Sequence, residues 1–147
     1  MRNTLEVIWE KLAPAVMPPS EQLWRDTARD FKNLWHCPNC IGAIDGKHVK
    51  IRAPPNSGSG FYNYKGYFSI VLLAVCDPHY RFIMVDIGDN GRQGDAGFFS
   101  HSRIGKRFED GSLNIPTGDL LPNSNISVPY YFAADDDFPL KVGIVKP

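Results

Sequence analysis

Two acidic positions in this sequence could act together on a divalent metal ion. Asp45 falls in the middle of a predicted strand over residues 41–51, and Asp135 follows a short apolar segment over residues 130–134. Neighbouring strands lie about 4.8 Å apart, so two carboxylates on adjacent strands can reach one cation. Magnesium prefers oxygen ligands, and paired magnesium ions can activate water and stabilise charge during phosphodiester cleavage. The pattern indicates a metal-dependent nuclease site.

Each of these acids also has a structural interpretation. Asp45 precedes Gly46 within a strand and could belong to a bulge or turn. The run Asp135–Asp137 could form a solvated acidic turn. Three further acids are not expected to be metal ligands: Asp86, Asp95 and Glu109. A loop-capping role suits Asp95, and a solvated helix face suits Glu109.

Basic side chains gather around the first acid and the loop that follows it. They are Lys47, His48, Lys50, Arg52 and Lys65. Aromatic residues alternate with them, namely Phe61, Tyr62, Tyr64 and Tyr67. Basic and aromatic groups together can follow a nucleic-acid backbone and stack on its bases. The cluster therefore predicts DNA contact, although such tyrosines can instead pack the base of a loop.

A zinc site is the other metal hypothesis, because Cys37 and Cys40 form a CxxC pair. Structural zinc needs four ligands, usually supplied by a second CxxC or a spaced histidine pair. The remaining cysteine, Cys76, lies in an apolar run, and His36 and His48 complete no familiar spacing. We therefore expect ordinary thiols here rather than a zinc centre.

Short helices are expected before the first strand. Apolar residues recur at helical spacing within residues 5–12, and Ser20 is suited to cap a second helix. Four residues of that second helix would line one face: Trp24, Ala28, Phe31 and Trp35. Both helices are expected to cover part of the sheet.

The rest of the chain predicts an α/β fold with a mixed sheet. The expected elements are strands over 41–51, 67–77 and 81–88, a helix over 95–111, a loop over 111–129 and a strand over 130–134. The first three strands would form an antiparallel meander, with the apolar second strand buried on both faces. A helical crossover makes the fourth strand parallel to an earlier one, and next to the first strand it would bring the two acids together.

The bulk properties of the chain exclude little. Its 147 residues suffice for one domain with a core, and 43% hydrophobic content is typical of a globular protein. Sixteen Lys and Arg balance sixteen Asp and Glu, so net charge neither favours nor excludes a nucleic-acid partner. No segment resembles a signal peptide or reaches transmembrane length, which predicts an intracellular protein without membrane contact.

Several long motifs resemble the DDE nuclease domain of the PIF/Harbinger transposases and their domesticated relatives. They are GAIDGKHVKI, the following APPNSGSGFYNYKGYFSIVLLAVCD, YRFIMVDIGDNGRQGDAGFFSHSRIGK and FAADDDFPLK. The last is similar to the GDxxFPL segment of that family, and its Phe-Pro-Leu fixes the register of the acid. The likeness extends over most of the chain from about Trp9.

The resemblance implies an RNase H-like nuclease domain over 37–147, preceded by a helical segment over 1–36. It implies that Asp45 and Asp135 are the catalytic, metal-binding acids, with Mg²⁺ or Mn²⁺ as cofactor and DNA as substrate. The family's third acid, a glutamate on a later helix, has no counterpart in these residues, so cleavage by them is expected to be absent or impaired. The alternative is a domesticated, non-catalytic remnant that binds DNA or a protein. A Myb-like partner protein and a nuclear location, with the cytoplasm as a second compartment, are further implications.

Overall fold

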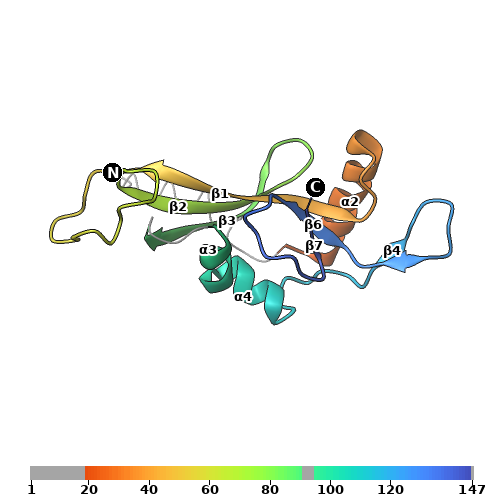
Figure 1. Ribbon diagram of the computed structural model, residues 1–147. Coiled ribbons are helices and arrows are strands. Elements are labelled where there is room, and N and C mark those ends of the chain that lie inside the picture. The colour runs from red at the N-terminus through yellow and green to blue at the C-terminus, as the bar shows by residue number, and fades with distance from the viewer. Residues whose placement is uncertain (1–18, 91–94, 147) are drawn as a thin grey trace, which may run out of the picture.

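The computed structural model describes residues 19–90 and 95–146, which form a mixed α/β fold (Figure 1). The described elements are α2 (Glu21–Trp35), β1 (Cys40–Lys50), β2 (Ser69–Cys76), β3 (Phe82–Asn90), α3 (Asp95–His101), α4 (Arg103–Glu109), β4 (Asp119–Leu120), β5 (Ser127–Val128), β6 (Tyr131–Ala134) and β7 (Ile144–Val145). Five strands form one sheet in the order β3-β2-β1-β6-β7, and β4 and β5 form a separate hairpin. The helix predicted over 5–12 lies outside the described residues.

Helix α2 begins where the sequence predicts. The Ser20 hydroxyl accepts a hydrogen bond from the Leu23 amide, and the helix ends at His36 in the left-handed conformation. Trp24, Ala28 and Phe31 are buried, as expected for one apolar face. Trp35 differs from the prediction because it is 52% exposed. It lies at the end of the helix, where its indole donates to the Pro78 carbonyl instead of entering the core.

The first three strands form the predicted antiparallel meander, in which β2 pairs with β1 on one side and β3 on the other. The expectation that β2 is buried on both faces is wrong. Its residues alternate between fully buried and partly buried, because one face alone packs into the core. Val71, Leu73 and Val75 carry that face, and the alternation follows the period of two in a strand.

Strand β6 lies beside β1 and runs parallel to it, as predicted. The pairing ends at Ile44 and Ala134, although β1 continues to Lys50. Beyond β6, the two-residue strand β7 adds a further parallel pairing. The sequence did not predict β7, since two residues carry no detectable alternation.

The single helix predicted over 95–111 is divided into α3 and α4 at Ser102. The Ser102 hydroxyl donates to the Phe99 carbonyl and accepts from the Gly105 amide, so it begins a new helix. A Cβ atom at Gly105 would lie 1.8 Å from the Phe99 carbonyl oxygen. The close turn between the helices therefore requires glycine at this position.

One hydrophobic cluster joins the helices to the sheet. The Trp24 ring from α2 meets Phe132 of β6 edge-on at 5.6 Å, and the Trp24 indole donates to the Leu113 carbonyl at 2.7 Å. Phe99 of α3 packs against Phe108 of α4 at 6.0 Å.

Among the described residues, no helix combines the length and the apolarity needed to cross a bilayer.

Candidate active site

Asp45 lies at the point on β1 where the pairing with β6 ends. Its preceding residue, Ile44, is the last to pair with β6, opposite Ala134. Ile44 is buried, whereas Asp45 is exposed, because consecutive side chains of a strand point to opposite faces. The Asp45 carboxylate accepts a hydrogen bond from the Gly46 amide at 2.7 Å through Oδ1.

Asp135 follows Ala134 directly, so it leaves β6 at the level where Asp45 leaves the paired part of β1. Its backbone carbonyl accepts from the Phe138 amide, and its Oδ1 accepts from the Asp137 amide at 3.1 Å. Phe138 is 1% exposed and packs against Phe99 at 5.9 Å. The buried Phe138 ring thus fixes the acidic turn of residues 135–137 against the core. The carboxylates of this turn remain exposed.

Asp45, Asp135 and Asp137 line one surface pocket at this position. The sequence analysis did not predict Asp137 as a site residue. The turn places residues 135 and 137 on the same side, and this geometry identifies Asp137 as a pocket residue. Asp136 does not line the pocket. In the described part of the chain, Oδ2 of Asp45 and Oδ2 of Asp135 accept no hydrogen bond, which leaves oxygen donors of the kind that Mg²⁺ prefers.

The donor set is nevertheless sparse. Across residues 19–90 and 95–146, no group of three or more His, Cys, Asp or Glu side chains converges closely enough to hold a metal ion. The structure therefore brings the two predicted acids to one pocket, with Asp137 beside them, without assembling a compact three-ligand cluster.

Most of the predicted basic residues border the same pocket. Lys47, His48 and Lys65 line it, together with Tyr64 and Tyr67. Lys50 lies next to it, with its ammonium 5.9 Å from the centre of the Tyr67 ring. Arg52 is exposed but is not among the lining residues.

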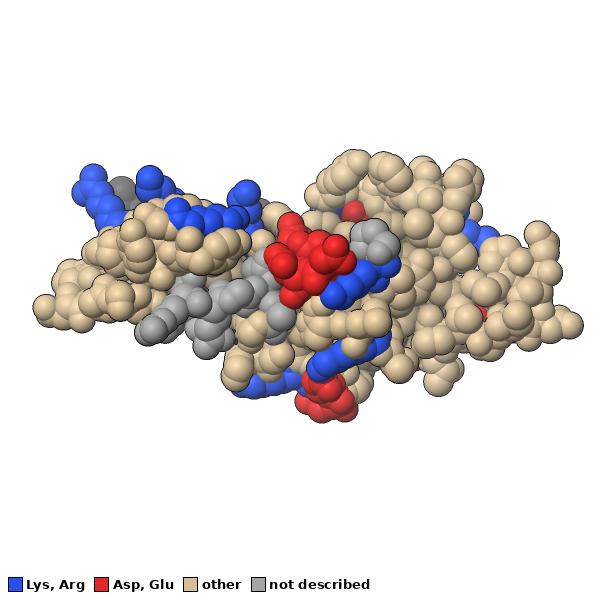
Figure 2. All heavy atoms as spheres, viewed as in Figure 1, with Lys and Arg blue, Asp and Glu red and all other residues tan. Residues whose placement is uncertain are grey.

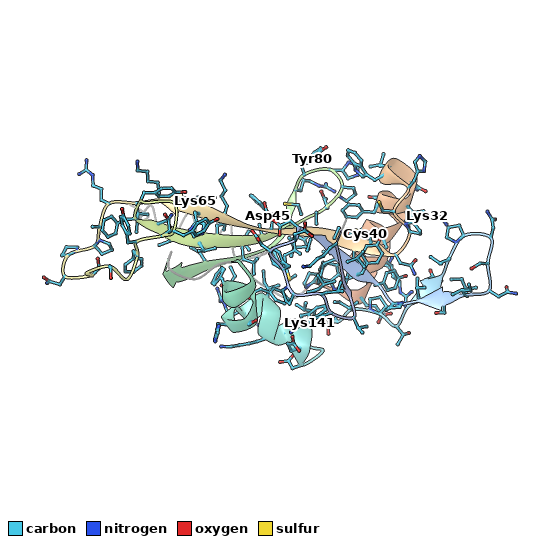
Figure 3. All side chains as sticks on the ribbon, in the orientation of Figure 1. Lys32, Cys40, Asp45, Lys65, Tyr80 and Lys141 are labelled. Atoms are coloured by element: carbon cyan, nitrogen blue, oxygen red, sulfur yellow. The ribbon has the colours of Figure 1, made fainter. Side chains whose placement is uncertain are left out.

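Basic side chains lie both beside the acids and farther toward one end of the molecule (Figure 2). Figure 2 shows lysine and arginine side chains gathered over β1 and the loop that follows it, and an acidic patch near the middle of the same face. In Figure 3, Asp45 lies near the middle of the long axis, and Lys65 lies toward the end that carries the β1–β2 loop.

Comparison with known proteins identifies the family. The family described as DDE superfamily endonuclease matches residues 44–146, a span that includes both aspartates and most of the sheet. The chain belongs to the DDE superfamily endonucleases.

Several curated relatives of this endonuclease-family chain have similar sequences. The protein named "Putative nuclease HARBI1" from Rattus norvegicus is 29% identical over 110 residues, which cover 74% of this chain and 32% of that protein. HARBI1 from Homo sapiens is 27% identical over the same length. "Protein ALP1-like" from Arabidopsis thaliana is 33% identical over 121 residues, covering 80% of this chain and 29% of that protein. The chain thus spans about a third of the relatives it matches, and no solved structure matches it.

The other acids of this DDE-family chain lie away from the pocket. Asp86 is opposite Leu73, which is opposite Gly46, so it points to the face opposite Asp45. There it accepts from the Arg103 amide at 2.5 Å and pairs with the Arg103 guanidinium at 3.3 Å, which fixes the start of α4. Glu109 is exposed and pairs with Lys141. Asp95 begins α3, and its side chain lies outside the described residues.

Among the described residues, no third His, Cys, Asp or Glu side chain joins Cys37 and Cys40 in a group that could hold a metal ion. Cys40 is 1% exposed, and burial raises the pKa of its thiol to about 11. Its sulfur contacts the Gly42 carbonyl, and the Cys37 sulfur contacts the Trp35 carbonyl. A thiol whose pKa is raised by burial is a poor nucleophile and a poor metal ligand, so Cys40 is a packing residue.

Proposed function

We propose that this chain is the catalytic part of a metal-dependent DNA endonuclease of the Harbinger transposase type, built on an RNase H-like sheet. The observation that carries the proposal is the shared pocket of Asp45 and Asp135, which directly follow the last paired residues of the neighbouring parallel strands β1 and β6. The strand order β3-β2-β1-β6-β7, with an antiparallel meander and a parallel strand next to β1, supports the RNase H-like assignment. Membership in the endonuclease family supports the reaction class.

Asp45 and Asp135 would hold the divalent metal, Mg²⁺ or Mn²⁺, and Asp137 is placed to assist. Hard cations of this kind take carboxylate oxygens and keep several waters, so two or three carboxylates suffice together with a substrate phosphate. When bound, the metal would supply Lewis-acid activation of the phosphate and of an attacking water.

The remaining residues of the pocket act on the DNA itself. Lys47 and Lys65 place positive charge beside the acids, which attracts the phosphate backbone and orients it. Lys50 and Arg52 extend this basic surface along β1 and into the loop. Phosphate contacts of this kind position a strand without reading its sequence.

Two measurements test the proposal: Mn²⁺ binding followed by electron paramagnetic resonance, and nicking of supercoiled plasmid with Mg²⁺ or Mn²⁺. Asp45→Asn and Asp135→Asn should each abolish Mn²⁺ binding and reduce nicking by at least about 100-fold. Asp136→Asn is the matched control, because this neighbour is also exposed but does not line the pocket. Equal activity in all three variants would contradict the assignment.

The second candidate is a non-catalytic DNA- or protein-binding remnant of the same fold. One observation on the described residues supports it, since no three His, Cys, Asp or Glu side chains among them converge closely enough to hold a metal ion. For the same reason, we expect the 147-residue chain to cleave DNA weakly. A folded chain that binds DNA but neither binds Mn²⁺ nor nicks plasmid would establish the remnant.

The cellular setting is also part of the proposal. We place residues 1–36 as a helical segment before a nuclease domain over 37–147, in a protein of the nucleus that can also occur in the cytoplasm. A Myb-like protein would assist with DNA targeting. Fluorescence microscopy of the tagged protein tests the location, and co-purification tests the partner.

A further inference from the structure

An exposed aromatic side chain, Tyr64, lines the same pocket as the acids. Its residue is 74% exposed. The Lys65 ammonium lies 5.4 Å from the centre of its ring, and the His48 ring meets it edge-on at 5.7 Å. Single exposed aromatics are common on protein surfaces, so exposure alone assigns no role. What distinguishes Tyr64 is how firmly its turn is held.

A buried polar network fixes the turn that carries Tyr64. Asn63 is 3% exposed, and its Oδ1 accepts from the amides of Lys65 and Tyr67 at 3.0 and 3.2 Å. Its Nδ2 donates to the Ser69 hydroxyl at 2.8 Å. The turn residues are thereby tied to the first residue of β2.

The network continues from Ser69 to β1. The Ser69 hydroxyl lies 2.9 Å from Nδ1 of His48, and Ser69 and His48 are both buried. Because the Ser69 oxygen accepts from Asn63, its own proton is available for His48 Nδ1, which suits a neutral imidazole. Burial lowers the pKa of His48, and the positive charge of Lys65 lowers it further. The Tyr64 turn is thus anchored to the strand that carries Asp45.

This arrangement suits a nucleobase. An aromatic ring stacks on the face of any base, and a neighbouring cation attracts the phosphate of the same nucleotide. Inside a duplex, both faces of each base are already stacked on neighbouring bases. Only a nucleotide that has left the stack can offer a face to Tyr64, and taking a base out of the helix costs a few kcal/mol, least where it is already unpaired.

We propose that Tyr64 is a stacking platform for one unpaired nucleobase of the DNA strand that enters the pocket. The site then prefers single-stranded or locally opened DNA to intact duplex. This inference rests on the proposed function and adds the form of the substrate. Tyr64 touches the base, while Asn63, Ser69 and His48 hold the turn in place.

Binding without cleavage tests the platform. Fluorescence anisotropy of a labelled single-stranded oligonucleotide, and of the corresponding duplex, is measured in the presence of EDTA. Tyr64→Ala should weaken single-strand binding by roughly 5- to 100-fold, the range of base–aromatic stacking, and should leave duplex binding nearly unchanged. Tyr64→Trp should restore single-strand binding, because it keeps an aromatic face.

Tyr80→Ala is the matched control. Tyr80 is 79% exposed and, like Tyr64, meets another ring edge-on, in this case Trp35. Figure 3 places it at the β2–β3 turn, away from Lys65. This variant should bind both DNA forms as the parent does, and circular dichroism verifies that each variant is folded.

Two results would overturn the platform: unchanged single-strand binding in Tyr64→Ala, or equal losses for single strand and duplex. The test is separable from the nuclease proposal. If the chain binds single strands through Tyr64 but does not cleave DNA, the stacking proposal stands and the nuclease proposal fails. If the chain cleaves DNA and the Tyr64→Ala variant is as active as the parent, the nuclease proposal stands and the stacking proposal fails.

Discussion

The two halves of β1 belong to one strand but have different surroundings. From Cys40 to Ile44 the strand pairs with β6, and from Ala43 onward it also pairs with β2. The Ile41 and Ile44 side chains of this half are almost fully buried. From Asp45 to Lys50 it pairs with β2 alone, and its side chains line the pocket or face solvent. The first half contributes to the hydrophobic core, and the second half carries the side chains that line the pocket. Ending β6 early is what exposes the second half.

The largest effect is expected in the structural half. Phe132 of β6 pairs with Gly42, is 0% exposed, and packs between Trp24 and Phe108. Phe132→Ala should lower the free energy of unfolding by about 3–5 kcal/mol, measured by urea denaturation. Phe132→Leu should cost less, because it keeps more of the buried volume. Equal, small losses would mean that this half of the sheet is less well packed than the structure indicates.

The next largest effect is expected at Asp86, an acid that stabilises the fold and does not line the pocket. Asp86 anchors the start of α4 on the face opposite Asp45. Asp86→Ala should lower the free energy of unfolding by about 1–3 kcal/mol, because it leaves the Arg103 amide without its acceptor. Mn²⁺ binding by the folded fraction should not change. If the variant loses Mn²⁺ binding while its stability is unchanged, Asp86 is a metal ligand. The two faces of the sheet would then not differ in function.

A smaller, pH-dependent effect is expected from His48. Burial and Lys65 lower its pKa in the folded state, so below about pH 6.5 the unfolded chain takes up a proton that the folded chain resists. Stability should therefore decrease as the pH falls below about 6.5, and His48 should contribute nothing above that value. His48→Gln should make this decrease smaller. The measurement is the midpoint of urea denaturation at a series of pH values above and below about 6.5. An identical pH dependence in the variant would show that His48 titrates freely.

The smallest effect on stability is expected at Lys47, in the second half of β1. This side chain is exposed and lines the pocket, so Lys47→Ala should change the free energy of unfolding by no more than about 0.5 kcal/mol. DNA binding should weaken, and the slope of log K against log salt concentration should fall by about one. A larger loss of stability would make Lys47 part of the scaffold.

Much of the scaffold is predictable from local patterns. Ser20 caps its helix as predicted, and the three strands of the meander follow from alternation and turn residues. The break at Ser102 is not predictable, because serine is compatible with a continuous helix. Two contacts decide it: the Asp86 carboxylate, 17 residues away, accepts from the Arg103 amide, and Gly105 approaches the Phe99 carbonyl closely within the turn.

The site follows the same rule. Asp45 and Asp135 are identifiable because each occurs at a recognisable place relative to a strand. Asp137 depends on the path of a turn, which the buried Phe138 determines. The connection from Asn63 through Ser69 to His48 joins residues up to 21 positions apart in a specific geometry. No pattern in the sequence encodes that geometry before the loop has folded.

The contact between Gly46 and Asp45 has a consequence for backbone dynamics. Within the described residues, no strand pairs with β1 beyond Ile44 on the side of β6, and the Gly46 amide donates instead to the Asp45 carboxylate. Amide hydrogens of β1 that point toward β2 should remain protected from exchange along the paired strand. Those that point to the β6 side should exchange slowly up to Ile44 and quickly beyond it, and slower exchange there would report that a ligand has covered the free edge.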